Sequence, residues 1–331
     1  MVSTGPLMRS QTSMTPGLNL KLRLISHRLF MIIAVLWGAA TLSFAVVKFI
    51  PGDPVSVITG GEGVVDEAVR AEIIQQFGLD KPLWQQYISY SGHALVGDLG
   101  QSYLYRQPVI SVISNGLKET LPLALGGLGF ALFVSIINAV LTAGRRHRAR
   151  DLVVGLELIL LSTPVYWIGI LLLSIFSFSL QWFPVTGNDG FMSLILPIIT
   201  LSLPLIAVLS QVLRDGMEEA LSQPFATTVR TRGVSEFTLR ARHVLRHAAL
   251  AISTLTGTLL ASVLGGSVLT ETVFGRAGIG QVMLSAIENR DMPLVLGLVM
   301  FSAFLFVVIN LLIDGLYLLI DPRLRKQEAI A

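Results

Sequence analysis

The stretch RDGMEEALSQPFATTVRTRGVSEFTLRARHVLR, from Arg214 to Arg246, separates two apolar runs that are each long enough to cross a membrane. It is polar and rich in arginine, and Gly233 lies near its centre. The part from Met217 to Arg232 has the pattern of a helix. We expect this helix to break or bend at Pro224, because proline lacks the N–H that a continuing helix needs.

The part after the glycine has the pattern of a second helix start. Ser235 can cap it, and Glu236 lies in the first turn, where a negative charge is favourable. Two helices joined at a glycine on the basic side of a membrane protein predict a docking surface. The alternative is a solvated loop whose arginines only mark the cytoplasmic side.

The composition places most of the chain in a membrane. Of the 331 residues 53% are hydrophobic and 14% are charged, and the mean hydropathy is +0.71. Soluble domains carry about 25% charged residues. The net charge is only +3 and the arginines gather beside apolar runs, which argues against a nucleic-acid partner.

The sequence also limits the chemistry that this chain can perform. It has no cysteine, so disulfides and thiolate sites are excluded. It has no GxxxxGK[ST] phosphate loop, no HExxH and no GxSxG pattern. We therefore expect no catalytic residue, cofactor or metal site, and no hydrolysis of ATP by this chain.

The apolar runs predict an all-α polytopic membrane protein, because about 20 residues of helix cross the hydrocarbon. The six expected transmembrane helices are 29–50, 120–143, 152–180, 192–213, 248–270 and 294–320. Pro197 and Pro204 predict kinks in the fourth.

Charge sets the expected orientation, because basic loops stay in the cytoplasm. The segment 51–117 carries seven acidic and three basic residues, so we place it outside as a subdomain. Within it we expect one helix near 66–77 that ends at Gly78 and another near 81–95. The remaining expected divisions are a cytoplasmic tail 1–28, a membrane core 118–320 that contains the polar loop 214–247, and a cytoplasmic tail 321–331.

The chain resembles the permease subunits of bacterial ABC importers, in the oligopeptide/dipeptide/nickel branch. The stretch quoted above is similar to the cytoplasmic EAA-type loop of these permeases. Further matching blocks are PGDP at 51–54, FGLDKPLWQQY at 77–87, GDLGQSY at 97–103, STPVYWIGILL at 162–172, WFPVTG at 182–187, LILPIITLSLP at 194–204, ETVFGRAGIGQVMLSAI at 271–287, RDMPLVLG at 290–297 and INLLIDGLYLLIDPRLR at 309–325. Two departures stand out: the EAA triplet is Thr227-Thr228-Val229, and the later Leu-Pro is Leu250-Ala251.

The resemblance implies a type I importer transmembrane domain in the bacterial inner membrane. It implies a second permease subunit that forms a heterodimer with this chain, two cytosolic ATP-binding subunits and an extracytoplasmic solute-binding protein. The implied mechanism is alternating access, and the expected substrate is a short peptide. Nickel, metal–opine or other metallophore chelates, glutathione and some glycans remain alternatives within the same branch.

The resemblance also implies that the core 118–320 is a permease core and that its loop 214–247 is a coupling loop, which docks on an ATPase subunit. The expected interface comprises Glu218, Phe225, Ala226, Arg230, Arg232, Gly233, Ser235 and Glu236. Phe225 and Ala226 can form a small apolar knob, while the charged residues can pair with a charged rim. The alternatives are a topology signal for the arginines and an interfacial anchor for Phe225.

Three ionisable residues, Glu157, Glu271 and Asp314, fall within or at the edge of apolar runs. Charges there are costly and face the bundle interior or a cavity, which makes them candidate functional residues. We expect Glu157 and Glu271 to line the translocation path and Asp314 to be structural. The alternative for each is a hydrogen bond to a neighbouring helix.

Two other classes of protein remain. A secondary transporter would show repeats with broken half-helices and a paired ion site. A membrane-embedded enzyme would show paired histidines or carboxylates at depth. The sequence shows neither clearly, and genes for ATPases and a secreted binding protein beside this one would separate the three classes.

Overall fold

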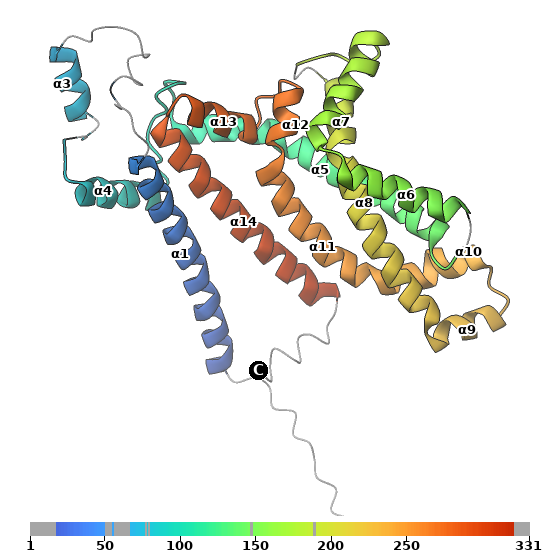
Figure 1. Ribbon diagram of the computed structural model, residues 1–331. Coiled ribbons are helices and arrows are strands. Elements are labelled where there is room, and N and C mark those ends of the chain that lie inside the picture. The colour runs from blue at the N-terminus through green and yellow to red at the C-terminus, as the bar shows by residue number, and fades with distance from the viewer. Residues whose placement is uncertain are drawn as a thin grey trace, which may run out of the picture.

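The computed structural model describes residues 18–49, 55, 67–76, 78, 80–145, 148–187 and 190–320 (Figure 1). Within these ranges every named element is a helix, and the one isolated β-bridge joins Gln101 and Pro108. The elements are α1 (Leu18–Phe49), α3 (Glu67–Gln76), α4 (Leu83–Leu95), α5 (Val109–Thr142), α6 (Arg148–Ser162), α7 (Val165–Leu172), the π-helix η1 (Leu173–Ser179), α8 (Met192–Ser222), α9 (Pro224–Thr231), α10 (Glu236–Thr238), the π-helix η2 (Leu239–Val244), α11 (Leu245–Gly266), α12 (Val268–Val273), α13 (Ile279–Glu288) and α14 (Met292–Ile320).

Several of these helices have the length and apolarity of a membrane span. In the described part of the chain Val109–Thr142, Met192–Ser222 and Met292–Leu312 qualify singly. The bent pair formed by α6 and α7–η1 counts as a fourth if it is one span. The described apolar part of α1, Phe30–Val46, is shorter.

The expected span 152–180 is divided into two helices that meet at an angle of 103°. The division falls at Pro164, whose extended backbone (φ −59°, ψ 132°) precedes α7. Proline cannot donate to the helix before it and forces the preceding residue out of helical geometry. Pro197 and Pro204, by contrast, lie inside the single helix α8.

Two helices extend beyond the apolar runs from which they were predicted. The helix α5 begins at Val109 rather than near 120, and α8 continues to Ser222 rather than ending near 213. The added turns of α8 bury Met217 and Ala220 in an apolar cluster with η2 and α11. An apolar run marks the hydrocarbon, whereas the helix continues as long as one face finds a partner.

The centre of the molecule is the contact between α5 and α8, joined by residues of α11 and α14 in one apolar cluster. Two glycines of α5 allow the close approach. A Cβ at Gly126 would lie 2.6 Å from Ile198 Cδ1, and one at Gly127 would lie 3.0 Å from Leu201 Cδ2. Small residues at such contacts let membrane helices pack at short distance.

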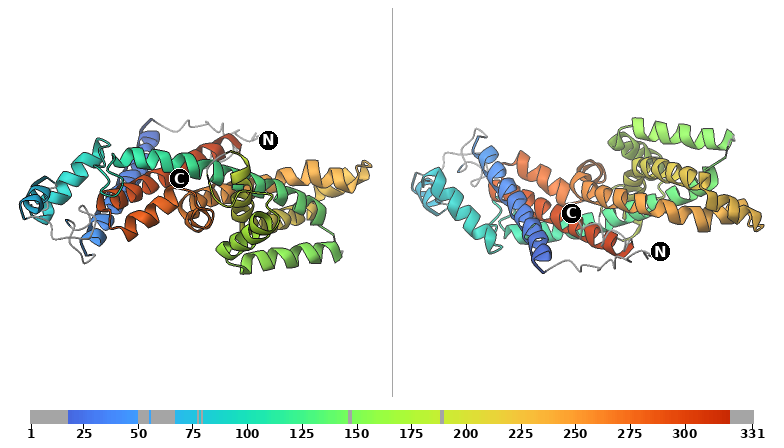
Figure 2. Two further views of the ribbon diagram at one scale, coloured as in Figure 1. Left: turned by 90° about the horizontal axis from the view of Figure 1, so that it is seen from above. Right: turned by 90° about the horizontal axis from the view of Figure 1, so that it is seen from below.

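The short helices gather at opposite ends of the long ones. Figure 1 shows α4, α12 and α13 at one end of the long helices and α9 and α10 at the other. The molecule is also elongated when it is seen from above and from below (Figure 2). The helix α4 rests on α1, where Tyr87 and Thr41 share a hydrogen bond of 2.7 Å and Phe44 contacts the Tyr87 and Tyr90 rings. The expected helices near 66–77 and 81–95 are thus confirmed as α3 and α4.

Candidate functional site

The coupling loop folds as predicted around its proline and its glycine. Gln223 is extended, Pro224 begins α9, and α9 ends just before Gly233, which has φ +76°. In this left-handed region glycine is favoured, because a side chain clashes with its own backbone there. After this turn α10 begins three residues later, at Glu236.

Ser235 caps the second helix, as expected. Its Oγ accepts a hydrogen bond from the backbone N–H of Thr238 at 3.3 Å. The capped turn continues directly into η2 and α11, so the loop is helical over most of its length.

The two residues expected to form an apolar knob face the protein itself. Ala226 is fully buried, and the Phe225 ring is half-buried and stacks on the His247 ring of α11 at 4.4 Å between centroids. These contacts fix α9 on the start of α11. The exposed apolar residue of this region is Phe237, whose exposed fraction is 57%. Sequence reasoning missed it, although a large apolar residue two positions after a cap in a polar loop is a usable signal.

The charges of the loop form a chain of ion pairs between α9 and η2. Arg230 Nε donates to Glu236 Oε1 at 2.8 Å, and Arg240 Nη2 lies 3.4 Å from Glu236 Oε2. The hydrogen bond from Arg230, aided by the positive charges of both arginines, lowers the pKa of Glu236. Arg232 is exposed, and no ion pair of it is found in the described part of the chain.

Glu218 does not share a surface with these residues. Its Oε1 accepts from the Gly144 backbone N–H at 3.3 Å and pairs with Arg150 Nη2 at 3.2 Å. Both side chains of this pair are about one third exposed (33% and 35%), so it is a partly solvated link from α8 to α6 and to the end of α5.

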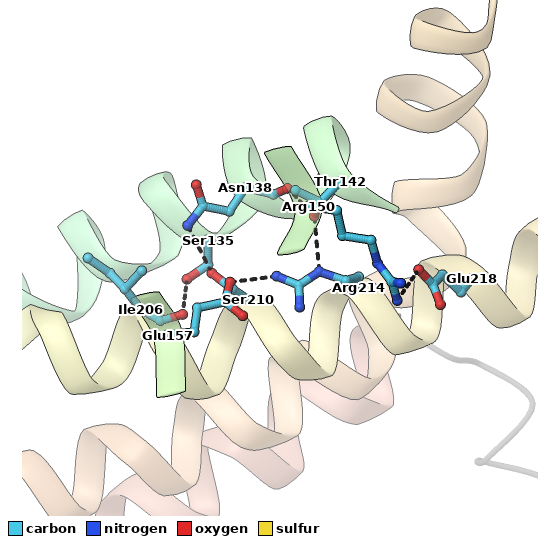
Figure 3. A network of polar contacts seen from close by, with 9 residues as sticks. All are labelled: Ser135, Asn138, Thr142, Arg150, Glu157, Ile206, Ser210, Arg214 and Glu218. Atoms are coloured by element: carbon cyan, nitrogen blue, oxygen red, sulfur yellow. Dashed lines mark hydrogen bonds and ion pairs between the residues drawn. The ribbon is translucent and has the colours of Figure 1, made fainter. Parts of the chain in front are cut away.

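Glu157 lies in a buried cluster that joins three helices (Figure 3). Its Oε1 pairs with Arg214 Nη2 of α8 at 2.5 Å, and both side chains are 3% exposed. Arg214 Nε also donates to Thr142 Oγ1 at the end of α5, at 3.0 Å. We call these three residues the Arg214 cluster.

Glu271 is fully buried at the other end of the molecule, where α5, α12 and α13 meet. Thr120 and Ser267 donate their hydroxyls to Oε1 at 2.6 and 2.8 Å, and the Gln281 backbone N–H donates to Oε2 at 3.0 Å. In this conformation the carboxylate therefore faces protein donors and not an open path.

Two further buried charges were not singled out from the sequence. Arg276 pairs with Glu119 at 2.6 Å, and Asp291 accepts from the Ser102 hydroxyl and from the Leu104 backbone N–H at 3.0 Å. Asp291 directly precedes α14, so an acidic residue before a proline-containing helix start was the available signal. The side chain of Asp314 lies outside the described residues.

Comparison with known proteins assigns this arrangement to a family. Residues 131–326 match the family described as "Binding-protein-dependent transport system inner membrane component". The di/tripeptide transport system permease protein DppB of Pseudomonas aeruginosa (strain UCBPP-PA14) is 35% identical over 93% of this chain and 100% of its own length. A putative peptide transport system permease protein of Brucella abortus (strain 2308) is 37% identical over 91% of this chain and 98% of its own.

The chain is also similar to a permease named for another substrate and to a solved structure. The glutathione transport system permease protein GsiC of Escherichia coli O6:H1 is 33% identical over 92% of this chain and 99% of its own. Among solved structures, the MetNI methionine ABC transporter in inward-facing conformations matches with a TM-score of 0.50 and 14% identity, over 64% of this chain and 96% of that chain. At this identity the likeness concerns the fold alone.

Proposed function

Because the chain belongs to the family of binding-protein-dependent transport system inner membrane components, we propose that it forms half of the membrane pathway of an importer for short peptides. It is a multi-pass inner-membrane transport component and not an enzyme. The observation that carries the substrate proposal is the likeness, over nine tenths of the chain, to permeases named for di- and tripeptides and for peptides. Glutathione is the second candidate, because a permease named for it is 33% identical.

The proposed topology has six spans with both termini in the cytoplasm. The described helices α5, α8 and α14 and the bent pair α6–α7 would supply four, and α1 and α11 the other two. The arginine-rich coupling loop and the acidic segment 51–117 support this orientation, since basic loops stay inside.

The proposed partners are a second permease subunit, two cytosolic ATPases and an extracytoplasmic binding protein. ATP binding closes the ATPases, the coupling loop moves with them, and the pathway opens outward to receive substrate. What supports this role for the loop is its construction. Ala226 and Phe225 fasten α9 to the body of the protein, while Arg232 and Phe237 remain exposed.

Within this proposal the eight expected interface residues fall into three groups. Arg230, Arg232 and Glu236 offer charges at the surface, with Phe237 as an apolar contact that an interface would bury. Ala226, Phe225, Gly233 and Ser235 shape the loop from within. Glu218 lies outside the exposed surface of the loop and links α8 to α6 through its ion pair with Arg150.

The test uses the full complex, assembled with the subunits encoded beside this gene and reconstituted in liposomes. We expect uptake of a radiolabelled dipeptide that requires both ATP and the binding protein, and that stops when the phosphate-loop lysine of the ATPases is replaced. Labelled glutathione and nickel, added singly, report the alternative substrates. Dipeptide uptake by this chain without ATPases would contradict the proposal.

A further inference from the structure

The helix α6 is attached to the rest of the chain in an unusual way. Of its described side chains, Glu157 alone is buried. Its large apolar residues face outward, with exposed fractions of 74% for Leu152, 58% for Leu156 and 62% for Ile159. Val153, Val154 and Leu160 are half-buried, but the one fully buried contact among the described side chains of α6 is polar.

The buried contact of α6 is an ion pair that depends on one arginine. Arg214 pairs with Glu157 Oε1, while Glu157 Oε2 is buried and finds no hydrogen-bond partner among the residues that the structure describes. The same guanidinium reaches Thr142 through Nε, so α5, α6 and α8 meet at one side chain. Buried ion pairs add little net stability compared with apolar contacts, but they can fix a unique register between elements.

The position of Arg214 connects this cluster to the coupling loop. It lies in the part of α8 that runs on to Ser222, and only Gln223 separates α8 from α9. The partly solvated pair of Arg150 and Glu218 adds a second link between α6 and α8, one turn closer to α9.

The helix α7, the second part of the bent pair, contacts the N-terminal half of α8. A Cβ at Gly169 of α7 would lie 3.3 Å from Thr200 Cγ2 of α8 and 3.2 Å from Val273 Cγ1 of α12. Thr200 and Arg214 are separated by about 21 Å along α8, at 1.5 Å per residue. The α6–α7 pair therefore touches both halves of α8.

From this geometry we propose that Arg214 is a positioning residue for transport: through Glu157 it fixes α6 to the cytoplasmic half of α8, so that α6 and α7 move together with the coupling loop. The inference rests on the proposed function, because it assumes that an ATPase moves α9. Arginine is favoured at this position, because its planar guanidinium presents Nε to Thr142 and Nη2 to Glu157 at once, a fork that a lysine ammonium does not offer.

The first test measures coupling in the reconstituted complex. For Arg214→Lys, Arg214→Gln and Glu157→Gln we expect dipeptide uptake per ATP hydrolysed to fall about tenfold, while ATP hydrolysis itself continues. The exchanged pair Glu157→Arg/Arg214→Glu restores part of the ratio. Asp291→Asn is the matched control: it also removes a buried charge, but far from α6, so it lowers the melting temperature and leaves the ratio unchanged.

The second test measures the distance itself and needs no transport. The chain contains no cysteine, so spin labels can be placed at two exposed positions, Asp151→Cys on α6 and Glu219→Cys on α8. In the complex we expect the same narrow distance distribution with and without trapped ATP, and a broadened one in Glu157→Gln.

Each result bears on the proposal separately from the proposed function. An unchanged coupling ratio in Arg214→Gln and Glu157→Gln, or a parent complex in which ATP changes the α6–α8 distance, overturns the inference. A parent complex that shows no ATP-dependent uptake overturns the proposed function instead, and the distance measurement then still reports on the link between α6 and α8.

Discussion

At Gly233 the backbone has a left-handed conformation that few residues other than glycine adopt. Its φ of +76° belongs to glycine, yet nothing lies within 4 Å of a Cβ placed there. Replacement therefore strains the turn between α9 and α10 without a clash, at a cost of about 1–3 kcal/mol. The consequence is local: the angle between the two helices changes, while the membrane part is untouched.

We predict that Gly233→Val inserts in the membrane normally but loses most of its uptake per ATP. The β-branched side chain disfavours the left-handed conformation, whereas Gly233→Asn, the control, tolerates it and retains coupling. Uptake and ATP hydrolysis are measured together in proteoliposomes. Normal uptake by Gly233→Val would count against a docking role for the loop.

The Glu236 carboxylate gives a prediction about pH. The Arg230 hydrogen bond lowers its pKa, so the stabilisation from this group is present above the ordinary glutamate pKa and is lost only as the pH falls through the lower folded value. Between about pH 6 and 8 the ratio of parent to Glu236→Gln uptake is therefore expected to stay constant. If the ratio instead changed with pH and had a midpoint between about pH 6 and 8, the ion pair of Arg230 with Glu236 would not be as described here.

At the scale of elements, the junction of α5, α12 and α13 depends on a glycine at position 278, where there is no room for a side chain. A Cβ at Gly278 would lie 2.3 Å from the Glu271 carboxylate, which three donors hold in place. We predict that Gly278→Ala displaces Glu271 and costs about 1–3 kcal/mol of stability. Gly129→Ala in α5 is the control, since nothing lies within 4 Å of its Cβ. Equal melting temperatures for the two variants would refute the packing described for this junction.

Local chemistry made several element boundaries predictable. Pro224 begins a helix and Ser235 caps one because both effects act within a few residues. The attachment of α6 was not predictable in the same way. Glu157 was recognised as an ionisable residue in an apolar run, but its partner Arg214 is 57 residues away in sequence. Only the packing of α6 on α8 brings the two together.

The expected single span 152–180 shows the same limit. Pro164 signals a break, but no rule of composition gives the angle of 103° between the two parts. In the folded chain α7 lies close to α8 and α12 at Gly169, and these contacts between distant segments are not evident from composition. The roles expected for Glu157 and Glu271 in a translocation path stay predictions, since both are buried in this conformation.

At the scale of the whole molecule, the account requires the two ends of the helix bundle to face opposite sides of the membrane. One end holds α4, α12 and α13 and the opposite end holds the coupling loop (Figure 1), and the proposed topology places the first outside and the second in the cytoplasm. Energy supplied by separate ATPases would enter at α9 and reach the outer end along α8 and the α6–α7 pair. The proposed six-span topology gives the coupling loop a single sidedness, which can be measured.

The most direct measurement is the labelling of Phe237→Cys, which is the sole cysteine of that variant. We predict that a membrane-impermeant maleimide labels it in inside-out vesicles but not in intact cells, and that assembly with the ATPases protects it. The charge-neutral control Val96→Cys, in the expected outer segment and 80% exposed, is labelled in intact cells instead. Labelling of Phe237→Cys from outside the cell, or equal labelling with and without the ATPases, would contradict the account.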